Sequence, residues 1–532
     1  MESRISSKDP IIAGILSVIF TIFTMAATCY TQVEGLSSTL FCTVIQLVSV
    51  VGFWLIFYHA MLWILTVTDS IRIDTMLYPL SCLPYVAFFA CIIGWLPYFL
   101  FEYPGVMTPD SVNQYAQVIG AYELTNHHAV IHTLLIGFFY KIGMSLTGNV
   151  YTALACYTLF QMICMAFVAA YVVRTMQKAG LHTAVCIITI CFYCFMPYNG
   201  IFAVTIWKDV LFAGNVTLFA AACLRLLLQN SREKITPLQL FTIVLPYVVS
   251  GFMICLLRTN GWYAFLISLP FILFAFRERL KLMLPVHAVI LLLVLFVKYP
   301  CMQIYEIKQA DFVESVSIPV QQIARVVVSG QSLTEDQTAT LAKMVDISRM
   351  QEVYQPDVSD GVKNLIRETG NGYIETHKGE FLSLWFSIGL RHPKAYFDAY
   401  VDQTKGFWYP DVSYEVGLAD GIYPNEFGLT WQSITGCHFM IKLREILFKL
   451  QDIIPLYGCL WSMGTMFWLV LIVAGICIRN QKTANILPAI PAIAIILTLC
   501  IATPVATEFR YAYALVYGLP LYLMLPFVQA KL

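Results

Sequence analysis

The stretch PIIAGILSVIFTIFTMAATCY, residues 10–30, contains no charged side chain. As an α-helix it would rise about 1.5 Å per residue, so it is long enough to cross a hydrocarbon layer about 30 Å thick. It lacks the small-residue cleavage site of a secretory signal peptide, which favours a permanent membrane anchor. The sequence therefore predicts a fold that is built in a lipid bilayer.

The composition of the whole chain agrees with this prediction. Of the 532 residues, 59% are hydrophobic and only 12% are charged, which is typical of a chain whose solvent is largely lipid. The 32 basic and 32 acidic residues cancel, and no lysine- and arginine-rich block is present, so a nucleic-acid partner is not expected. Most of the 16 cysteines lie inside apolar runs and are interpreted as small buried hydrophobic residues.

Eleven further apolar stretches meet the same length requirement. The predicted fold class is an all-α polytopic membrane protein with about 12 transmembrane helices, and the lipid bilayer is its first expected partner. The expected spans cover residues 10–30, 39–67, 77–101, 149–173, 182–203, 209–228, 239–257, 259–277, 281–300, 455–478, 484–503 and 511–528.

Basic residues beside the spans predict the orientation, because cytoplasmic loops retain lysine and arginine. With both termini in the cytoplasm, nearly all of these residues fall on the cytoplasmic side of a cell membrane. They are Arg4, Lys8, Arg72, Arg174, Lys178, Arg225, Arg232, Lys234, Arg277, Arg279, Lys281, Arg479, Lys482 and Lys531.

Two long connections then lie on the external side. The apolar stretch 129–145 would reverse the orientation if it crossed the membrane, so it is interpreted as interfacial or re-entrant. It belongs to a first large external loop, residues 102–148, and a second, mainly helical external segment follows later in the chain. The expected parts are two N-terminal spans in residues 1–76, a transmembrane core in 77–301, the external segment in 302–454 and C-terminal spans in 455–532.

A few charged residues lie at external span ends, where the positive-inside tendency disfavours cations. The cations are Lys208, Arg258, Lys298 and Arg510, and Asp110 in the first loop is an acid on the same side. Cations that hold a phosphate leaving group, with a carboxylate that accepts a hydroxyl proton, suit transfer from a lipid-linked phosphate donor. The alternative for each cation is that its side chain reaches to lipid headgroups, and Lys298 fits that alternative best.

The acidic residues have structural alternatives as well. Asp110 could simply cap a helix that begins at Ser111. Asp209 could pair with the lysine that precedes it, and Glu508 could pair with the arginine two positions later. The role of proton acceptor is therefore shared among three candidates at this point.

The stretch HHAVIH, residues 127–132, leaves metal binding open. His128 and His132 are four residues apart and would share one helix face, a spacing that can hold a metal. No third ligand is evident, so a divalent metal is one interpretation and hydrogen bonding or substrate contact is the other. Trp408 and Tyr409 are candidates for stacking on a sugar ring, with packing in an aromatic belt at the membrane surface as the alternative.

Seven short motifs follow one another along the chain. They are PDSVNQ (109–114), HHAVIHT (127–133), IWKDV (206–210), LRTNG (257–261), SIPVQQIAR (317–325), GFWYP (406–410) and EFRY (508–511). Their order resembles an uncharacterised bacterial family of polytopic membrane proteins whose layout is similar to that of GT-C glycosyltransferases. The resemblance implies a GT-C-like fold and an enzyme that takes a sugar from a polyprenyl phosphate donor at the outer leaflet. It also implies an aspartate base in the first large external loop, where Asp110 matches.

The leading hypothesis is inverting glycosyl transfer at the external face, from a polyprenyl phosphate sugar to a cell-envelope glycan, lipid or protein. Asp110 would be the general base. The residues expected to bind the donor phosphate or line the site are Lys208, Arg258, Arg510, Asn113, Gln114, His128, His132, Asn260 and Glu508. Two other classes stay open: a transporter or flippase of lipid-linked saccharides, with inverted repeats as its signature, and a non-catalytic envelope-assembly subunit.

Overall fold

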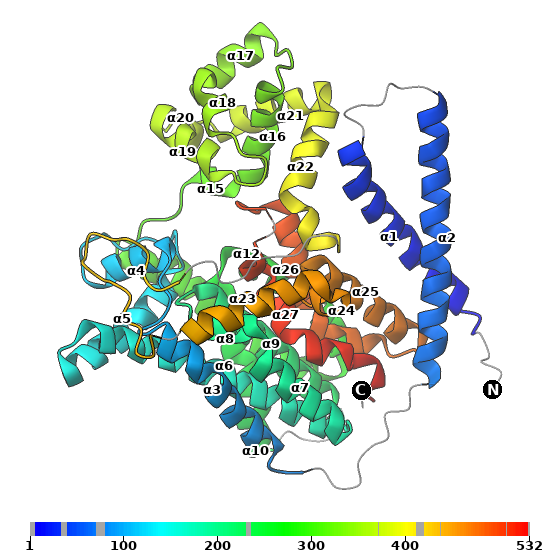
Figure 1. The fold of residues 1–532 in the computed structure, drawn as a ribbon, viewed down its shortest axis with the longest axis vertical. Helices are drawn as coiled ribbons and strands as arrows, with labels where there is room; N and C mark the ends of the chain where they lie inside the picture. Colours follow the sequence, from blue (N-terminus) through cyan, green and yellow to red (C-terminus); the bar gives the residue numbers. More distant parts are fainter. Residues whose placement is uncertain are drawn as a thin grey trace.

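The computed structural model describes residues 6–32, 40–70, 80–229, 236–370, 372–410, 420–436, 438–506 and 508–529, and in these residues it is built of helices without β-strands (Figure 1). Nine of the described helices are long and apolar enough to cross a membrane. The number is ten if α7 (Thr183–Phe195) and α8 (Pro197–Val204), which meet at a 53° bend, form one span. The prediction of an all-α polytopic membrane fold is confirmed.

One large hydrophobic core, called the main core below, holds most of these helices together. At its centre is α9 (Lys208–Leu227), nearly all of whose side chains are buried because α6, α11 and α27 pack around it. The principal helices are α1 (Asp9–Gln32), α2 (Leu40–Ser70), α3 (Leu83–Phe101), α6 (Val150–Lys178), α11 (Leu245–Leu257), α12 (Thr259–Ala275), α13 (Leu280–Phe296), α25 (Met463–Arg479), α26 (Ile490–Ile501) and α27 (Phe509–Leu523).

Some of the predicted spans differ in length from the helices that form. α12 and α25 have 17 residues each and α27 has 15, which is less than a full crossing needs. The stretch expected to be interfacial forms α5 (Val130–Thr147), which is itself long and apolar enough to cross. Of the basic residues that predicted the orientation, five lie outside the described residues: Arg4, Arg72, Arg232, Lys234 and Lys531.

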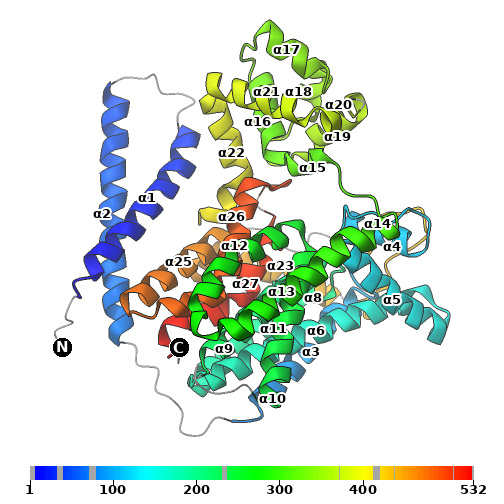
Figure 2. The same ribbon diagram turned by 180° about the vertical axis from the view of Figure 1, so that it is seen from behind.

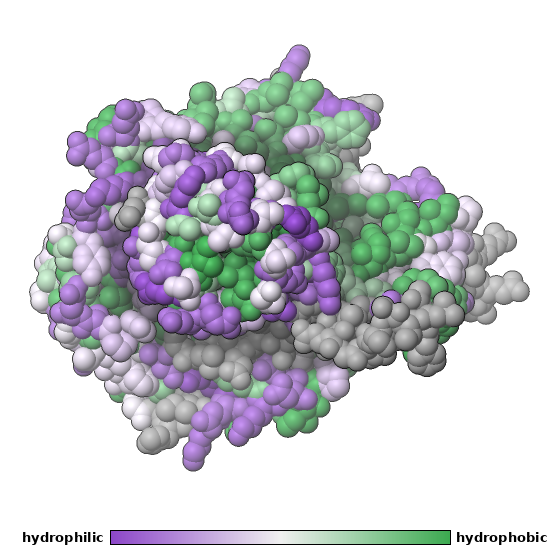
Figure 3. Space-filling view, turned by 90° about the horizontal axis from the view of Figure 1, so that it is seen from above, coloured by the Kyte–Doolittle hydropathy of each residue, from purple (hydrophilic) through white to green (hydrophobic). Residues whose placement is uncertain are grey.

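A second hydrophobic core forms a separate lobe, residues 312–400 (Figures 1 and 2). The lobe runs from α15 (Phe312–Ser315) through α16 (Ser317–Val328), α17 (Glu335–Ala342), α19 (Asp360–Thr369) and α21 (Lys378–Arg391) into α22 (Pro393–Trp408). A capping box, formed by Thr334 and Gln337, is present at the start of α17. Hydrophilic side chains gather around the lobe when it is seen from above (Figure 3).

The segment 302–454 is therefore divided between two cores. The second half of α22 leaves the lobe, because Val401, Phe407 and Trp408 are buried in the main core. Ile422 and Phe427 in the segment 420–436, and Phe448 in α23 (His438–Ile453), also pack against the main core.

Two backbone hydrogen bonds attach the lobe, and the residues that directly precede it, to the rest of the protein. The Asn126 N–H donates to the Lys308 carbonyl at 2.8 Å, and the Ser359 N–H donates to the Pro504 carbonyl at 3.0 Å. Asn126 directly precedes the motif HHAVIHT, and Pro504 lies just before EFRY. The lobe and the residues that lead into it are thus held next to two of the motifs that carry candidate site residues.

Candidate functional site

Short backbone pairings fold the first loop onto the main core. The Val106 N–H donates to the Val204 carbonyl at 3.0 Å, and the Ile206 N–H donates to the Val106 carbonyl at 2.9 Å. The helix α4 (Pro109–Val118) begins three residues after Val106, and α9 begins two residues after Ile206. The pairing therefore brings the starts of α4 and α9 together.

Asp110 lies in the first turn of α4 and faces Arg510. Its Oδ2 accepts a hydrogen bond from Arg510 Nη1 at 2.9 Å, although 400 positions of sequence separate the two residues. The capping alternative is wrong, because the helix begins at Pro109 with Thr108 as its N-cap rather than at Ser111. A carboxylate in the first turn still interacts favourably with the helix dipole.

The Arg510 guanidinium is held between rings and a second acid. It lies 4.6 Å from the centroid of Trp207 and 5.2 Å from that of Tyr511, and its Nε is 3.6 Å from Glu508 Oε1. The predicted pair of Glu508 and Arg510 is therefore present in addition to the pair with Asp110. Within the described residues, the buried Nε has no hydrogen-bond partner, and an unsatisfied buried donor costs about 1–3 kcal/mol.

A second ion pair lies next to the first. Arg258 donates from Nη1 to Asp209 Oδ1 and from Nε to Asn260 Oδ1, the latter at 3.0 Å. Its guanidinium lies 4.4 Å from the Tyr511 centroid, so one ring contacts both site arginines. Pairing with its neighbour Lys208 was the structural alternative for Asp209, and the structure pairs Asp209 with Arg258 instead.

Lys208 occupies the start of α9, with its Nζ 3.4 Å from His128 Nδ1. Burial, together with the charge of Lys208, lowers the pKa of His128 to about 3. The imidazole is therefore neutral at pH 7, and its unprotonated nitrogen can accept a hydrogen bond from the ammonium. His128 is thus placed to orient Lys208.

The charges around Asp110 set its protonation. Burial on its own would raise the pKa of Asp110, but the positive charges of Arg510 and Lys208 hold that pKa well below its usual value. The carboxylate is consequently ionised at neutral pH.

Gln114 and His132 belong to a buried hydrogen-bond network beneath this region. His132 Nδ1 lies 2.9 Å from Gln114 Oε1, and His132 Nε2 lies 2.6 Å from the Tyr157 hydroxyl. Gln114 Nε2 also donates to Thr133 Oγ1 at 2.9 Å. Both ring nitrogens of His132 are occupied, so this histidine fixes α4 against α5 and α6.

The remaining candidates in the first loop are Asn113 and the two histidines, His128 and His132, for which metal binding was one interpretation. The Asn113 side-chain oxygen accepts a hydrogen bond from Gln117 Nε2 at 2.8 Å, within α4. In the part of the chain that the structure describes, no three His, Cys, Asp or Glu side chains are grouped to hold a metal ion. His128 contacts Lys208 and His132 contacts Gln114, so the two histidines have different partners.

Trp408 and Tyr409 lie in the packing between α22, α1 and α25. The Trp408 ring is 5.4 Å from the Phe23 ring, and the Tyr409 ring is 6.4 Å from the Trp468 ring. Their contacts are typical of helix packing, and their role in sugar stacking stays a prediction.

Trp207 and Tyr511 are two of the rings that contact the site cations, and neither was among the residues predicted from the sequence. Each of them adjoins a candidate cation in the motifs IWKDV and EFRY, so adjacency to Lys208 or Arg510 was the available signal. An arginine over an aromatic face gains about 0.5–2 kcal/mol, depending on desolvation. These rings therefore help to hold the guanidinium groups in place.

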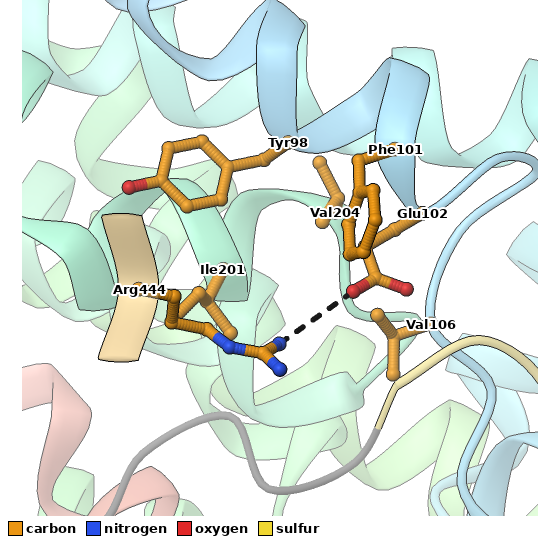
Figure 4. Close-up of a pocket in the computed structure, with 7 residues that line it drawn as sticks. All are labelled: Tyr98, Phe101, Glu102, Val106, Ile201, Val204 and Arg444. Carbon is orange, nitrogen blue, oxygen red and sulfur yellow. Dashed lines mark ion pairs between the residues drawn. The ribbon is translucent and has the colours of Figure 1, made fainter. Parts of the chain in front are cut away.

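A pocket lined in part by Val106 lies where α3 and α8 approach Arg444 (Figure 4). Its lining residues are Tyr98, Phe101, Glu102, Val106, Ile201, Val204 and Arg444. The buried Glu102 accepts a hydrogen bond from the Gly421 N–H at 2.8 Å and lies 3.8 Å from Arg444, which also pairs with Asp420. Burial, followed by the effect of Asp420, raises the pKa of Glu102 to about 8.

The residues that meet near the start of α4 are called the charged cluster below. They are Asp110, Lys208, Asp209, Arg258, Glu508 and Arg510. Asn260 and His128 contact the cluster directly.

Comparison with known proteins gives one match. Residues 119–531 match the model of a family described as "Family of unknown function (DUF6020)". The matched range starts nine residues after Asp110 and includes the motifs from HHAVIHT to EFRY. No curated protein and no solved structure matches the chain. The family model spans most of the sequence, and the chain belongs to the DUF6020 family.

Proposed function

We propose that this protein is a membrane glycosyltransferase that transfers a sugar from a polyprenyl phosphate donor to a cell-envelope acceptor at the external face. The observation that supports this most is the convergence of three cations with Asp110 in the charged cluster. Cations that merely reach to headgroups would point to lipid at separate places around the perimeter. Cations that share carboxylates and aromatic rings suit the binding of one anionic group.

The cluster offers suitable chemistry for both halves of such a reaction. Arg258 and Arg510 present planar guanidinium forks that match phosphate oxygens, and Lys208 adds a point charge. In the proposed step the bond between sugar C1 and the donor phosphate oxygen breaks, and its electron pair leaves on the phosphate. The acceptor oxygen forms the new bond to C1, and its proton passes to Asp110.

The ion pair of Asp110 and Arg510 suggests that donor binding comes before proton transfer. In the free protein the pair keeps Asp110 ionised but weakly basic. A donor phosphate that engages Arg510 would partly neutralise the guanidinium and raise the pKa of Asp110. The base would then be activated by donor binding.

The proposed orientation places both termini in the cytoplasm and the lobe outside. The lobe is fastened next to HHAVIHT and EFRY, which suits a part that covers the site and holds the acceptor. The positive-inside pattern of the sequence supports this orientation.

The test uses the purified full chain in lipid nanodiscs with a set of undecaprenyl phosphate sugars. Release of undecaprenyl phosphate in the presence of an envelope lipid extract supports the transferase. Native mass spectrometry measures donor binding separately from turnover. Binding without turnover of any donor would favour a flippase, and absence of binding to every donor would contradict both.

A further inference from the structure

The exposed apolar side chains of the lobe are concentrated in one place. Between residues 312 and 400, apart from the undescribed residue 371, the exposed large apolar side chains all lie on α21 and the start of α22. They are Leu382 (45% exposed), Phe386 (61%), Leu390 (69%) and Phe397 (47%). These four residues are called the apolar stripe below.

Helix geometry explains why three of them form a line. Leu382, Phe386 and Leu390 are four residues apart, so they lie on one face of α21. The opposite face is also apolar, because Phe381 and Ile388 are buried in the core of the lobe. A helix at the surface of a water-soluble domain carries polar residues on its outer face, whereas a helix that is apolar all round is covered on both sides.

Basic residues flank the apolar stripe. Lys378 at the start of α21, Arg391 at its end and Lys394 in α22 are exposed. The acid of the helix, Glu380, is already engaged by Lys343 and the Tyr373 hydroxyl. Lys378 lies 3.9 Å from Glu375, so the positive charge beside the stripe comes mainly from Arg391 and Lys394. Apolar side chains flanked by exposed positive charge are the pattern of a helix that lies at an anionic lipid surface.

The position of the stripe brings it close to the membrane. Phe397 and Val401 are one helical turn apart on α22, a rise of about 6 Å, and Val401 is already buried in the main core. In Figures 1 and 2, α21 lies on the side of the lobe that faces α1 and α2. The stripe is thus continuous, through α22, with the membrane-embedded part of the protein.

We propose that the apolar stripe inserts into the headgroup region of the bilayer on the side where the lobe stands. Phe386, Leu390 and neighbouring side chains would contact acyl chains, and the flanking basic residues would contact lipid phosphates. This anchor would fix the height of the lobe over the charged cluster.

Photo-crosslinking tests the proposal in the full chain. p-Benzoylphenylalanine replaces Phe386 in one variant and Leu390 in a second, and the proteins are irradiated in nanodiscs of phosphatidylglycerol and phosphatidylethanolamine. Thr338, exposed on α17, is the matched control position. We expect lipid adducts, detected by intact mass, at 386 and 390 at least about fivefold above the control.

Two outcomes would overturn it. Equal lipid labelling at 386, 390 and 338 would show that the stripe does not meet the bilayer. A crosslinked dimer at 386 or 390, in place of lipid adducts, would show that a second copy of the chain covers the stripe.

Discussion

Arg510 donates a hydrogen bond from Nη1 to Asp110 Oδ2 at 2.9 Å, joining the first turn of α27 to the first turn of α4. The contact is half-buried and is reinforced by the Trp207 ring under the guanidinium. Removal of either partner would take away the counter-ion that is hydrogen-bonded to the other charge in a partly dry environment, and only the Glu508 or Lys208 charge would remain nearby. The pair is therefore expected to contribute both to stability and to the properties of the charged cluster.

A double-mutant cycle measures that contribution. Asp110→Asn and Arg510→Gln should each lower the thermal stability of the purified protein, and the double variant should lose less than the sum of the two. We expect a coupling of about 0.5–3 kcal/mol, the range for residues in direct contact. Strictly additive losses would show that the two side chains do not interact in the membrane-embedded protein.

The proposed base predicts a separation of binding from turnover. Asp110→Asn should lower the turnover of undecaprenyl phosphate sugars by about 10²-fold or more, because proton transfer by a positioned side chain contributes about 10²–10⁴-fold. Donor binding should persist, since the three cations are retained. Glu123→Gln is the matched control, because Glu123 is an exposed acid of the same loop that pairs with Lys308. Equal turnover in the two variants would rule out Asp110 as the base.

Single sequence features predicted the spans and the boundary charges, because the length of an apolar run and the sign of a side chain are local properties. Which charged residues form ion pairs, in contrast, depends on how distant parts of the chain pack together. The sequence offered Lys208 as an alternative partner for Asp209, but adjacent residues on a helix point in different directions, and Asp209 reaches Arg258 instead. Trp207 and Tyr511 were missed for the same reason. The contact of Trp207 with Arg510 and that of Tyr511 with Arg258 each join residues far apart in the sequence.

The boundary between the lobe and the main core also could not be predicted from the sequence. The segment 302–454 is polar enough to be predicted as one external part, yet its own core ends near Tyr396 and the main core takes over at Val401. The change occurs inside one continuous helix, α22. Composition averages over such a helix, so the transition could be located only from packing.

The buried network of His132 predicts a structural effect. Tyr157→Phe removes the hydroxyl that contacts His132 Nε2 and should destabilise the protein by about 1–3 kcal/mol, since a buried nitrogen loses its partner. Tyr122→Phe is the control, because the Tyr122 hydroxyl contacts Glu426 at an exposed position. We expect a lower melting temperature for Tyr157→Phe, with donor affinity unchanged. A weaker donor affinity at unchanged stability would place His132 in the binding site instead.

The carboxyl group of Glu102 predicts a pH dependence of stability. Its pKa is raised to about 8 in the folded protein, so the folded state binds more protons than the unfolded state between pH 4.5 and 8. Stability from this group is therefore complete at low pH and is lost as the pH rises through 8, by at most about 1.4 kcal/mol per pH unit for one proton. His128 acts in the opposite direction but only below its unfolded pKa, because its folded pKa is about 3.

Between pH 7 and 8.5 the contribution of Glu102 to the pH dependence of stability is separated from that of His128, since His128 is then neutral in both states. Over this interval the melting temperature of the wild type should fall, and that of Glu102→Gln should fall less, because the amide stays neutral and can still accept the Gly421 N–H. Glu123→Gln should keep the wild-type slope. Parallel slopes for wild type and Glu102→Gln would mean that Glu102 is already ionised at pH 7. The ion pair with Arg444 would then hold it charged despite its burial.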